Sequence, residues 1–392
     1  MLQENWLHTM VDSGTAQTSD SATYKQKLPT SNFIGNINLR CKATVNNAGN
    51  DADFAHLFID QIDKIKLVGN GSSVIVDLEP KELQKIMTPI IGACPAQNRT
   101  SVEAEYEWVD LPIVMGRYKY DTEYILPAQL FKRLELQVEY SMETSDPAWD
   151  TGTFTPYVSV DEYISSKDPL SAKIIKRTQV ENGTTKSGTI DVDLPLGGIY
   201  KRIMVMVEDE DAADGTDVTQ VQLRVNNGSE LPLTEAWDIL QQINKDEFNL
   251  PLATIHGTTC KANDDTILTE LGTVKQFNVA WKDPNPTANA VSIVGCDAVS
   301  GGELTVDAYI SAALTEATDA NRTITADTTC QTLMFDAVSH TAIPEAVFIV
   351  FDKKGDMNLC PDSSVWNDCK VRLTGANSNG TYNVVLEEII SL

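Results

Sequence analysis

The densest cluster of potential metal ligands in this 392-residue sequence is the acidic run from Glu208 to Asp217. Calcium binds closely spaced oxygen ligands, and the run offers four aspartates: Asp209, Asp211, Asp214 and Asp217. The sixth position counted from Asp209 is not glycine, and the twelfth is not the glutamate that completes an EF-hand loop. We therefore interpret the run as a solvated loop between two strands, with a calcium site as the alternative, and expect no other metal or cofactor.

Catalytic motifs are missing from the sequence. Its four histidines form no H-E-x-x-H, and neither G-x-S-x-G nor G-x-x-x-x-G-K-[ST] occurs, so metalloprotease, nucleophile-elbow and P-loop chemistry lack their minimal signals. The carboxylate pairs Asp161-Glu162 and Glu387-Glu388 could suggest a glycosidase. Neighbouring residues of a strand point to opposite faces, so neither pair is expected to act jointly as acid and base. We expect no catalytic residue.

The cysteines give no metal or redox motif either. None of the seven belongs to a C-x-x-C pair, which removes the main signal for a zinc ribbon or a thioredoxin-like site. Cys360 and Cys369 are close enough in sequence to form a disulfide across a loop. The alternative is that they are buried thiols in a reducing cell.

Composition and charge limit the remaining classes. The net charge of −26 repels a phosphate backbone, so nucleic-acid binding over the whole surface is excluded. Hydrophobic residues at 42% and charged residues at 22% are typical of a folded globular chain. The longest apolar stretches, such as Ala346–Phe351, are too short to span a membrane, and the first residues show no secretory signal. We expect a soluble protein that is not exported by the usual route.

Short runs of alternating apolar and polar residues dominate the chain from Phe33 onward. Clear examples are residues 62–68, 102–109, 133–140 and 157–164. Such alternation, with turn residues between the runs, predicts half-buried strands in an antiparallel sandwich or barrel. Residues 1–31 are instead polar and rich in serine and threonine. We expect them to form an arm that stays disordered or packs on a neighbour.

One order of elements occurs twice in the chain. A strand, an Asn-Gly turn and a short helix follow one another around Asn70-Gly71, and again around Asn227-Gly228, 157 residues later. The closing strand Val158–Ile164 matches Val384–Ile390 at a larger offset of 226. The offsets differ by 69 residues, which predicts an insertion at about 250–344, in a surface region where added chain costs little. The sequence thus predicts a duplicated β-sandwich.

This layout resembles the double jelly-roll major capsid proteins of tailless icosahedral viruses that contain an internal membrane and infect bacteria or archaea. The similar local pieces are Asp193–Ile203, which enters the second half, and the two strand–Asn-Gly–helix segments. The resemblance implies an all-β fold of two tandem eight-stranded antiparallel jelly-roll β-sandwiches, each with a short flanking helix. The expected parts are an N-terminal arm (1–31), a first jelly roll (32–168), a linker (169–189) and a second jelly roll (190–392) with tower-like loops at about 250–344.

The resemblance also implies a structural role. In this family, homotrimers with a pseudo-hexagonal outline tile an icosahedral shell, and long loops build outward-facing towers. The expected partners are further copies of the chain, neighbouring capsomers, minor capsid or vertex proteins and an internal membrane, without direct nucleic-acid binding. The arm would lie at the base of the shell. The expected location is the virion, after assembly in the host cytoplasm.

Two other functions remain open at this stage. Tandem β-sandwiches also serve as adhesins or carbohydrate-binding modules, in which exposed aromatic rings form flat platforms. Trp149, Trp281 and Trp366 stand in turn-like contexts and are the candidates for such a platform, although such residues more often cap a core. A β-rich enzyme such as a glycosidase is the third possibility, disfavoured by the missing motifs.

Overall fold

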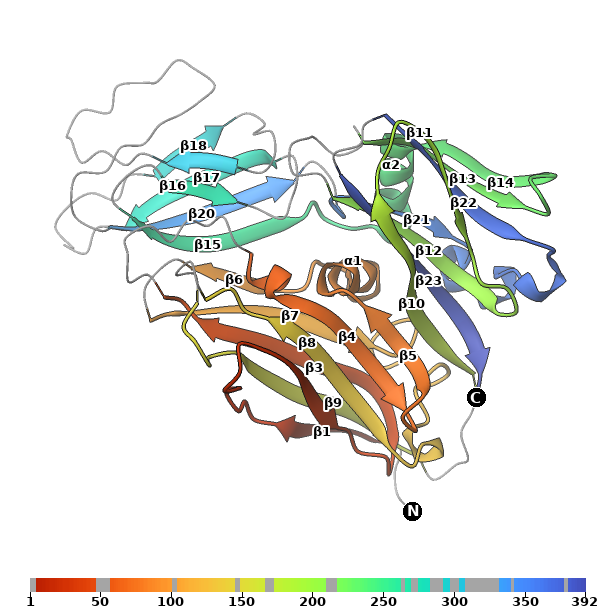
Figure 1. The fold of residues 1–392 in the computed structure, drawn as a ribbon, viewed down its shortest axis with the longest axis horizontal. Coiled ribbons are helices and arrows are strands. Elements are labelled where there is room, and N and C mark those ends of the chain that lie inside the picture. The colour runs from red at the N-terminus through yellow and green to blue at the C-terminus, as the bar shows by residue number, and fades with distance from the viewer. Residues whose placement is uncertain are drawn as a thin grey trace.

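The computed structural model of the chain is built mostly of β-strands, with few helices (Figure 1). It describes residues 5–46, 57–100, 104–144, 149–165, 173–208, 217–261, 265–268, 274–282, 292–296, 303–306, 331–339, 342–376 and 380–392. Within these ranges, no helix is both long enough and apolar enough to cross a membrane.

The first half of the chain forms a jelly roll of two facing four-stranded layers. One layer has the order β1-β9-β3-β7, with the bounds Asn5–Asp12, Thr155–Ile164, Phe33–Thr44 and Tyr106–Val114. The other has the order β2-β8-β4-β5, with the bounds Ser21–Lys27, Leu134–Ser141, Ile62–Gly69 and Ser73–Leu78. Helix α1 (Pro80–Ile91) follows β5. Alternate apolar residues point inward, as Val109, Leu111 and Ile113 do on β7, so the core lies between the layers.

The second half repeats this arrangement strand by strand. One layer has the order β10-β23-β12-β21, with the bounds Lys173–Thr184, Thr381–Ser391, Ile199–Glu208 and Ala346–Val350. The other has the order β11-β22-β13-β14, with the bounds Gly188–Asp193, Cys369–Gly375, Val218–Val225 and Glu230–Ala236. Helix α2 (Trp237–Phe248) follows β14, as α1 follows β5. The prediction of two tandem eight-stranded jelly rolls, each with one flanking helix, is confirmed.

The helices and their turns keep the offset predicted from the sequence. Helix α1 begins at residue 80 and ends at residue 91, and α2 begins at 237 and ends at 248, an offset of 157 at both ends. The hairpin before each helix turns through asparagine and glycine with positive φ, Asn70-Gly71 in the first roll and Asn227-Gly228 in the second. Asparagine and glycine adopt this conformation most readily, which explains why the dipeptide marks the same turn twice.

Strands β3 and β12 share a β-bulge at the same position. The unpaired residue is Gly35 in β3 and Lys201 in β12, and on both sides of it the two strands keep an offset of 166. Strand β3 pairs with β9, and β12 pairs with β23. Because the residues of β9 and β23 keep the offset of 226, each residue of the first roll can be matched with its counterpart in the second through the residues with which they pair. The matched pairs used below are Asp161 with Glu387, Asn36 with Arg202, and Lys42 with Glu208.

Two segments predicted to lie outside the sandwiches are strands of them. Residues 1–31 are predicted to form an arm that stays disordered or packs on a neighbour, but β1 pairs with β9 and β2 pairs with β8, so this segment supplies an edge strand to each layer of its own roll. The predicted linker at 169–189 contains β10, which pairs with β23 and β5. An edge strand buries little apolar area, so a polar sequence can fill that place while pairing its backbone groups. Low hydrophobicity therefore misled the prediction.

The described residues of the insertion between α2 and β21 include six further strands. They are β15 (Thr254–Lys261), β16 (Asp265–Leu268), β17 (Val274–Lys282), β18 (Ser292–Cys296), β19 (Glu303–Val306) and β20 (Gln331–Ser339). Strand β15 runs parallel to β6 (Gln97–Thr100), which precedes β7 of the first roll. The layer β1-β9-β3-β7 thus continues through β6 into the insertion, which lies at the far end of that sheet from β1 (Figure 1).

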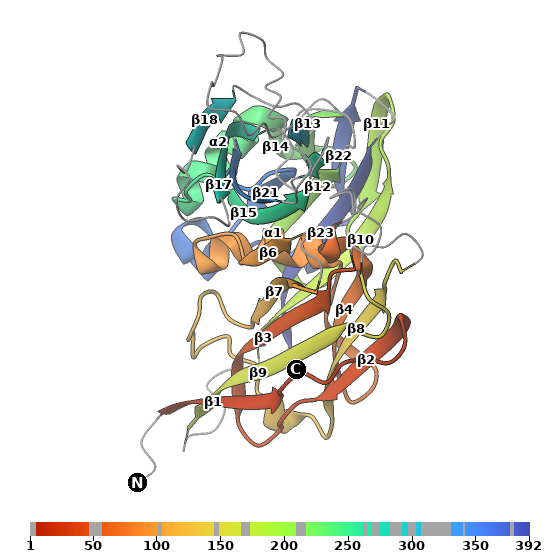
Figure 2. The ribbon, with the colours of Figure 1, turned by 90° about the vertical axis from the view of Figure 1, so that its left-hand side faces the viewer.

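The two rolls are joined along one edge and through one helix. Strands β5 and β10 pair in parallel, so a single eight-stranded sheet runs from the first roll into the second. Helix α1 lies between the rolls in both views, whereas α2 lies beside the second roll and farther from the first (Figures 1 and 2). The hydrophobic cluster of the first roll includes Met204, Phe348 and Val385 of the second. The rolls therefore form one packed unit.

Candidate functional site: the junction between the jelly rolls

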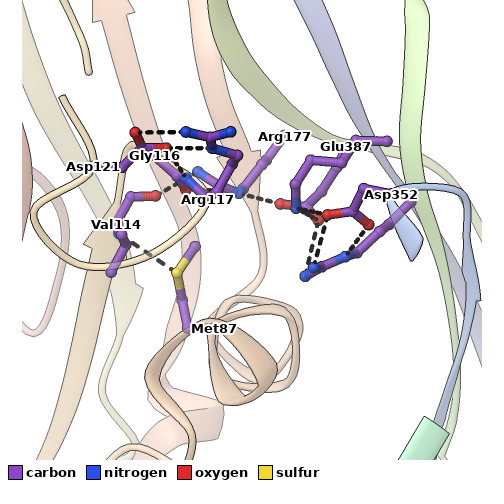
Figure 3. A network of polar contacts seen from close by, with 10 residues as sticks. Met87, Val114, Gly116, Arg117, Asp121, Arg177, Asp352 and Glu387 are labelled. Atoms are coloured by element: carbon purple, nitrogen blue, oxygen red, sulfur yellow. Dashed lines mark hydrogen bonds and ion pairs between the residues drawn. The ribbon is translucent and has the colours of Figure 1, made fainter. Parts of the chain in front are cut away.

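The centre of the junction is Arg177 on β10, whose side chain is fully buried. Its Nε lies 2.7 Å from Oε1 of Glu387 on β23. Its Nη1 donates a hydrogen bond of 2.7 Å to the carbonyl oxygen of Val114, and Nη2 donates one of 3.3 Å to that of Gly116. Figure 3 shows this side chain between the end of β7 in the first roll and Glu387 in the second. One guanidinium thus ties the two rolls together.

Glu387 also belongs to a larger group of buried charges. Lys201 Nζ lies 3.0 Å from Glu387 Oε2 and 3.6 Å from Asp352 Oδ2. Arg202 binds Asp352 through two parallel hydrogen bonds of 2.9 and 3.0 Å. The group therefore holds three cations and two carboxylates, and all five residues are buried. Buried ions require partners of opposite charge, because their desolvation is otherwise very costly.

The pKa values show how strongly this group is coupled. Burial alone would raise the pKa of Glu387, but the neighbouring Lys201, Arg177 and Arg202 together lower it to about 2. Burial and the neighbouring Arg202 lower the pKa of Lys201 to about 8, against the opposing effect of the two carboxylates. Glu387 therefore stays ionised at neutral pH, where it compensates the cations around it.

Acid is expected to weaken the junction through Glu387. Its pKa is about 2 in the folded chain and 4.5 ordinarily, so its contribution to stability is complete above about pH 4.5 and is lost as the pH falls toward 2. Glu387→Gln should therefore be less stable than the wild type at pH 6, with a difference that shrinks as the pH falls from 4.5 toward 2. Urea unfolding of both proteins across this range measures the difference, and a constant difference would contradict the assignment.

The loop that receives Arg177 is itself held by an ion pair. Arg117 Nε lies 2.8 Å from Asp121 Oδ2, and the backbone N–H of Arg117 donates to the same oxygen at 3.0 Å. Burial would raise the pKa of Asp121, but the hydrogen bonds from Arg117 outweigh it and lower the pKa below its ordinary value. A Cβ at Gly116 would lie 2.5 Å from the Asp121 Cβ, so only glycine fits where this loop presents its carbonyl to Arg177.

Helix α1 provides the second part of the junction. Its N-cap Glu79 accepts hydrogen bonds from Gln179 on β10 at 2.7 Å and from Asn383 on β23 at 3.2 Å. Further along the helix, Lys81 Nζ lies 3.1 Å from Glu208 Oε2 at the end of β12. Met87 packs on the first roll, where its sulfur accepts a hydrogen bond from the backbone N–H of Val114 at 3.5 Å. One face of α1 therefore binds its own roll and the other binds the second roll.

The predicted carboxylate pairs occupy matched positions in the two rolls. Glu387 binds Arg177, and Glu388 binds Lys176, the residue before Arg177 on β10, at 2.8 Å. Because neighbouring residues of a strand point to opposite faces, the two carboxylates do so as well, as predicted. In the first roll, Asp161 accepts hydrogen bonds from His8 at 2.7 Å and from Asn36 at 3.1 Å. The position that carries a buried charge network in the second roll thus carries a smaller polar cluster in the first.

The calcium candidate falls largely outside the described residues. Asp209, Asp211 and Asp214 lie there, whereas the described Asp217 is buried and accepts a hydrogen bond of 2.9 Å from the Thr185 hydroxyl. Among the described residues, no three His, Cys, Asp or Glu side chains are placed to hold a metal ion. Calcium at this run stays an untested alternative.

The remaining candidates from the sequence are three tryptophans and two cysteines. Trp149 is almost fully buried and its indole N–H donates to Glu107 at 3.2 Å, so it cannot form an exposed platform for glycans. Trp366 packs edge-on against Tyr200 at 5.5 Å, while the side chain of Trp281 lies outside the described residues. Cys360 and Cys369 are free thiols, and burial raises their pKa values to about 11 and about 12. Of the two alternatives left open by the sequence, the structure therefore has free thiols and no disulfide between Cys360 and Cys369.

Of the charged residues at the junction, sequence reasoning singles out Glu387 alone, and it misses the other members of the network. A signal for them exists in the run Ile199–Val207, where Lys201 and Arg202 interrupt a continuous apolar strand. Basic residues in such a strand must either face solvent or find buried carboxylates. Their partners Asp352 and Glu387 lie 150 or more residues away in sequence, so spacing alone could not identify them.

Comparison with known proteins finds likeness in fold and not in sequence. No protein-family model and no curated sequence matches the chain. Among solved structures, the STIV MCP, from the Sulfolobus turreted icosahedral virus, is similar over 99% of this chain and 97% of that one, with a TM-score of 0.59 and 14% identity. The major capsid protein P2 of bacteriophage PM2 is similar over 98% and 97%, with a TM-score of 0.52 and 9% identity.

A third structure extends this likeness. A chain of the PBCV-1 virus capsid is similar over 99% of this chain and 94% of that one, with a TM-score of 0.54 and 7% identity. These likenesses extend over both jelly rolls. The chain thus has the double jelly-roll fold, as its resemblance to that class of capsid protein implied.

Proposed function

We propose that the chain is a major capsid protein, a structural building block of an icosahedral virion. The observation that carries the proposal is the duplicated jelly roll in which a buried charge network and a shared helix hold the two rolls as one unit. Solved structures with this full-length fold include proteins named as major capsid proteins. A rigid block with two nearly equivalent halves is suited to tiling, since each half presents matched surfaces to its neighbours.

The proposed assembly is a homotrimer with a pseudo-hexagonal outline. Two rolls in each chain give six in three copies, and head-to-tail contacts between unlike surfaces close into rings when the rotation allows it. Neighbouring capsomers, minor capsid or vertex proteins and an internal membrane are the further proposed partners. The insertion at about 250–344 would form the outward tower. The proposed location is the virion, after assembly in the host cytoplasm.

The competing functions have less support. A tandem carbohydrate-binding module needs exposed aromatic platforms, and Trp149 is buried. A glycosidase needs two carboxylates that face one substrate, and the partners of Glu387 and Glu388 place these side chains on opposite faces of β23. A structural role requires neither feature, and we propose no enzymatic activity.

Negative-stain imaging of the purified full-length chain at moderate salt tests the proposal. Salt screens the repulsion between chains that each carry a charge of −26. We expect compact particles with a hexagonal outline, or closed shells at higher concentration. Two-lobed single molecules at every salt and protein concentration would contradict a capsid function and favour the tandem binding module, and screening against glycans would then follow.

A further inference from the structure

Within one chain, the outer face of one layer of the second roll is covered, whereas the matched face of the first roll is open. The outer face of β10-β23-β12-β21 is covered by α1 and the first roll, where Met204 and Phe348 belong to the same hydrophobic cluster as Leu83 and Met87. The corresponding outer face of β1-β9-β3-β7 is an open groove of about 1060 Å³. The groove is lined by residues that include His8, Met10, Lys42, Tyr106, Trp108 and Tyr157.

The two matched helices differ in the same way. Glu82 and Ile86 of α1 are fully buried. Their counterparts at the offset of 157 are Ile239 and Ile243 of α2, which are 48% and 39% exposed. Helix α2 is held to its own roll by Asn244, which exchanges hydrogen bonds of 2.6 and 2.9 Å with the backbone of Phe348. Its other face is therefore the counterpart of the α1 face that binds the second roll.

The charges on these two unoccupied surfaces are complementary. The pair Lys81–Glu208 joins α1 to β12 across the junction. The counterpart of Lys81 on α2 is Asp238, and the counterpart of Glu208 on β3 is Lys42, so both signs are reversed. Within the described part of the chain, neither Asp238 nor Lys42 takes part in an ion pair, and Lys42 lies 4.1 Å above the Tyr106 ring.

A second contact at the junction is polar, whereas the matched positions on α2 and in the groove are apolar. At the junction, Glu79 accepts hydrogen bonds from Gln179 and Asn383. The counterparts of these three residues are Ala236 on the α2 side and Met10 and Tyr157 in the groove. Met10 is 67% exposed, which is unusual for a large apolar side chain on a strand and indicates a surface that becomes covered.

We propose that the groove on β1-β9-β3-β7 receives helix α2 of a second copy of this chain, in the way that the second roll receives α1 within one copy. Asp238 of one copy then pairs with Lys42 of the next, and Ile239 and Ile243 cover the apolar residues of the groove. The contact joins unlike surfaces, so it repeats from copy to copy around a ring. This inference rests on the proposed function, since it names the surfaces through which the building block associates.

Charge reversal tests the pairing. Lys42→Asp and Asp238→Lys should each raise the dissociation constant of the oligomer about tenfold or more, because each places like charges together at a partly buried contact. The double variant should return toward the wild-type value. Lys132→Asp, at an exposed lysine outside the groove, makes the same change of charge and should leave association nearly unchanged. Sedimentation of the full-length chain over a range of concentrations provides the dissociation constants.

The outcomes separate this inference from the proposed function. An oligomer that is unaffected by both single variants, or a double variant as weak as the singles, would overturn the groove contact and leave the capsid function standing. A wild-type chain that stays monomeric at all concentrations would overturn both. Circular dichroism of each variant shows whether it is folded, so that lost association is not confused with misfolding.

Zero-length carbodiimide cross-linking gives a direct geometric readout on the wild-type chain. We expect a cross-link between Lys42 and Asp238 in the oligomer and none in diluted monomer. The partly exposed pair Lys66–Glu139, whose charged atoms lie 2.7 Å apart within one chain, serves as the positive control at both concentrations. An oligomer that gives the control cross-link but not Lys42–Asp238 would overturn the proposal.

Discussion

Replacing Arg177 with alanine is expected to lower the free energy of unfolding by about 3–5 kcal/mol, the range seen when one partner of a buried ion pair is removed. The variant would leave Glu387 with one fewer cation and the carbonyl oxygens of Val114 and Gly116 without their donor. Because these groups have almost no access to water, they cannot exchange the lost contacts for hydration. Urea unfolding at neutral pH measures the change.

Two further variants keep this prediction testable even if Arg177→Ala does not fold. Arg177→Lys retains the charge but cannot reach Glu387 and both carbonyls at once, so its loss should be smaller. Arg133→Ala removes an arginine whose side chain is 58% exposed and which pairs with Glu135, and it should change stability little. If Arg177→Ala were as stable as Arg133→Ala, the junction would not be held by the buried network.

Deleting residues 1–13, which removes β1, is expected to lower Tm by about 10 °C or more, equivalent to several kcal/mol in a domain of this size. Strand β1 pairs with β9 along its length, and its Trp6 packs against Tyr163 at 5.2 Å. Without it, the edge of β9 is left open, so the shortened chain should also aggregate more readily. Thermal unfolding followed by circular dichroism, with light scattering, gives both readouts.

A matched control distinguishes the effect of losing the whole strand from the effect of losing an exposed side chain on it. The variant Leu7→Ala removes an exposed apolar side chain that lies outside the groove and leaves the backbone pairing of β1 intact. Its Tm should stay close to that of the wild type. A shortened chain as stable as this control would restore the interpretation of the first residues as an arm that is not part of the jelly roll.

The fold could be predicted from the sequence because the repeat is visible in local signals. Asn70-Gly71 and Asn227-Gly228 mark tight turns, and the helices behind them begin and end at a constant offset. Local geometry sets these features, so a short stretch of sequence is enough to reveal them. The closing strands β9 and β23 were likewise matched through their alternation and their paired carboxylates.

The edge strands and the junction could not be predicted in the same way. Strand β2 is largely polar and the apolar residues of β1 do not alternate, so what makes both of them strands is a partner more than 100 residues away. The junction depends on contacts such as Arg177 with Glu387, which only the tertiary fold brings together. Sequence reasoning identified the carboxylate pairs as chemically interesting. It could not show that Glu387 serves to bind one roll to the other.

The central claim is that the chain is a block that associates into capsomers, and the mass of the full-length protein in solution tests it most directly. Sedimentation equilibrium at moderate salt should give three times the chain mass of 43.0 kDa, with the monomer appearing only on dilution. A mass of 43.0 kDa at every salt and protein concentration would contradict the account.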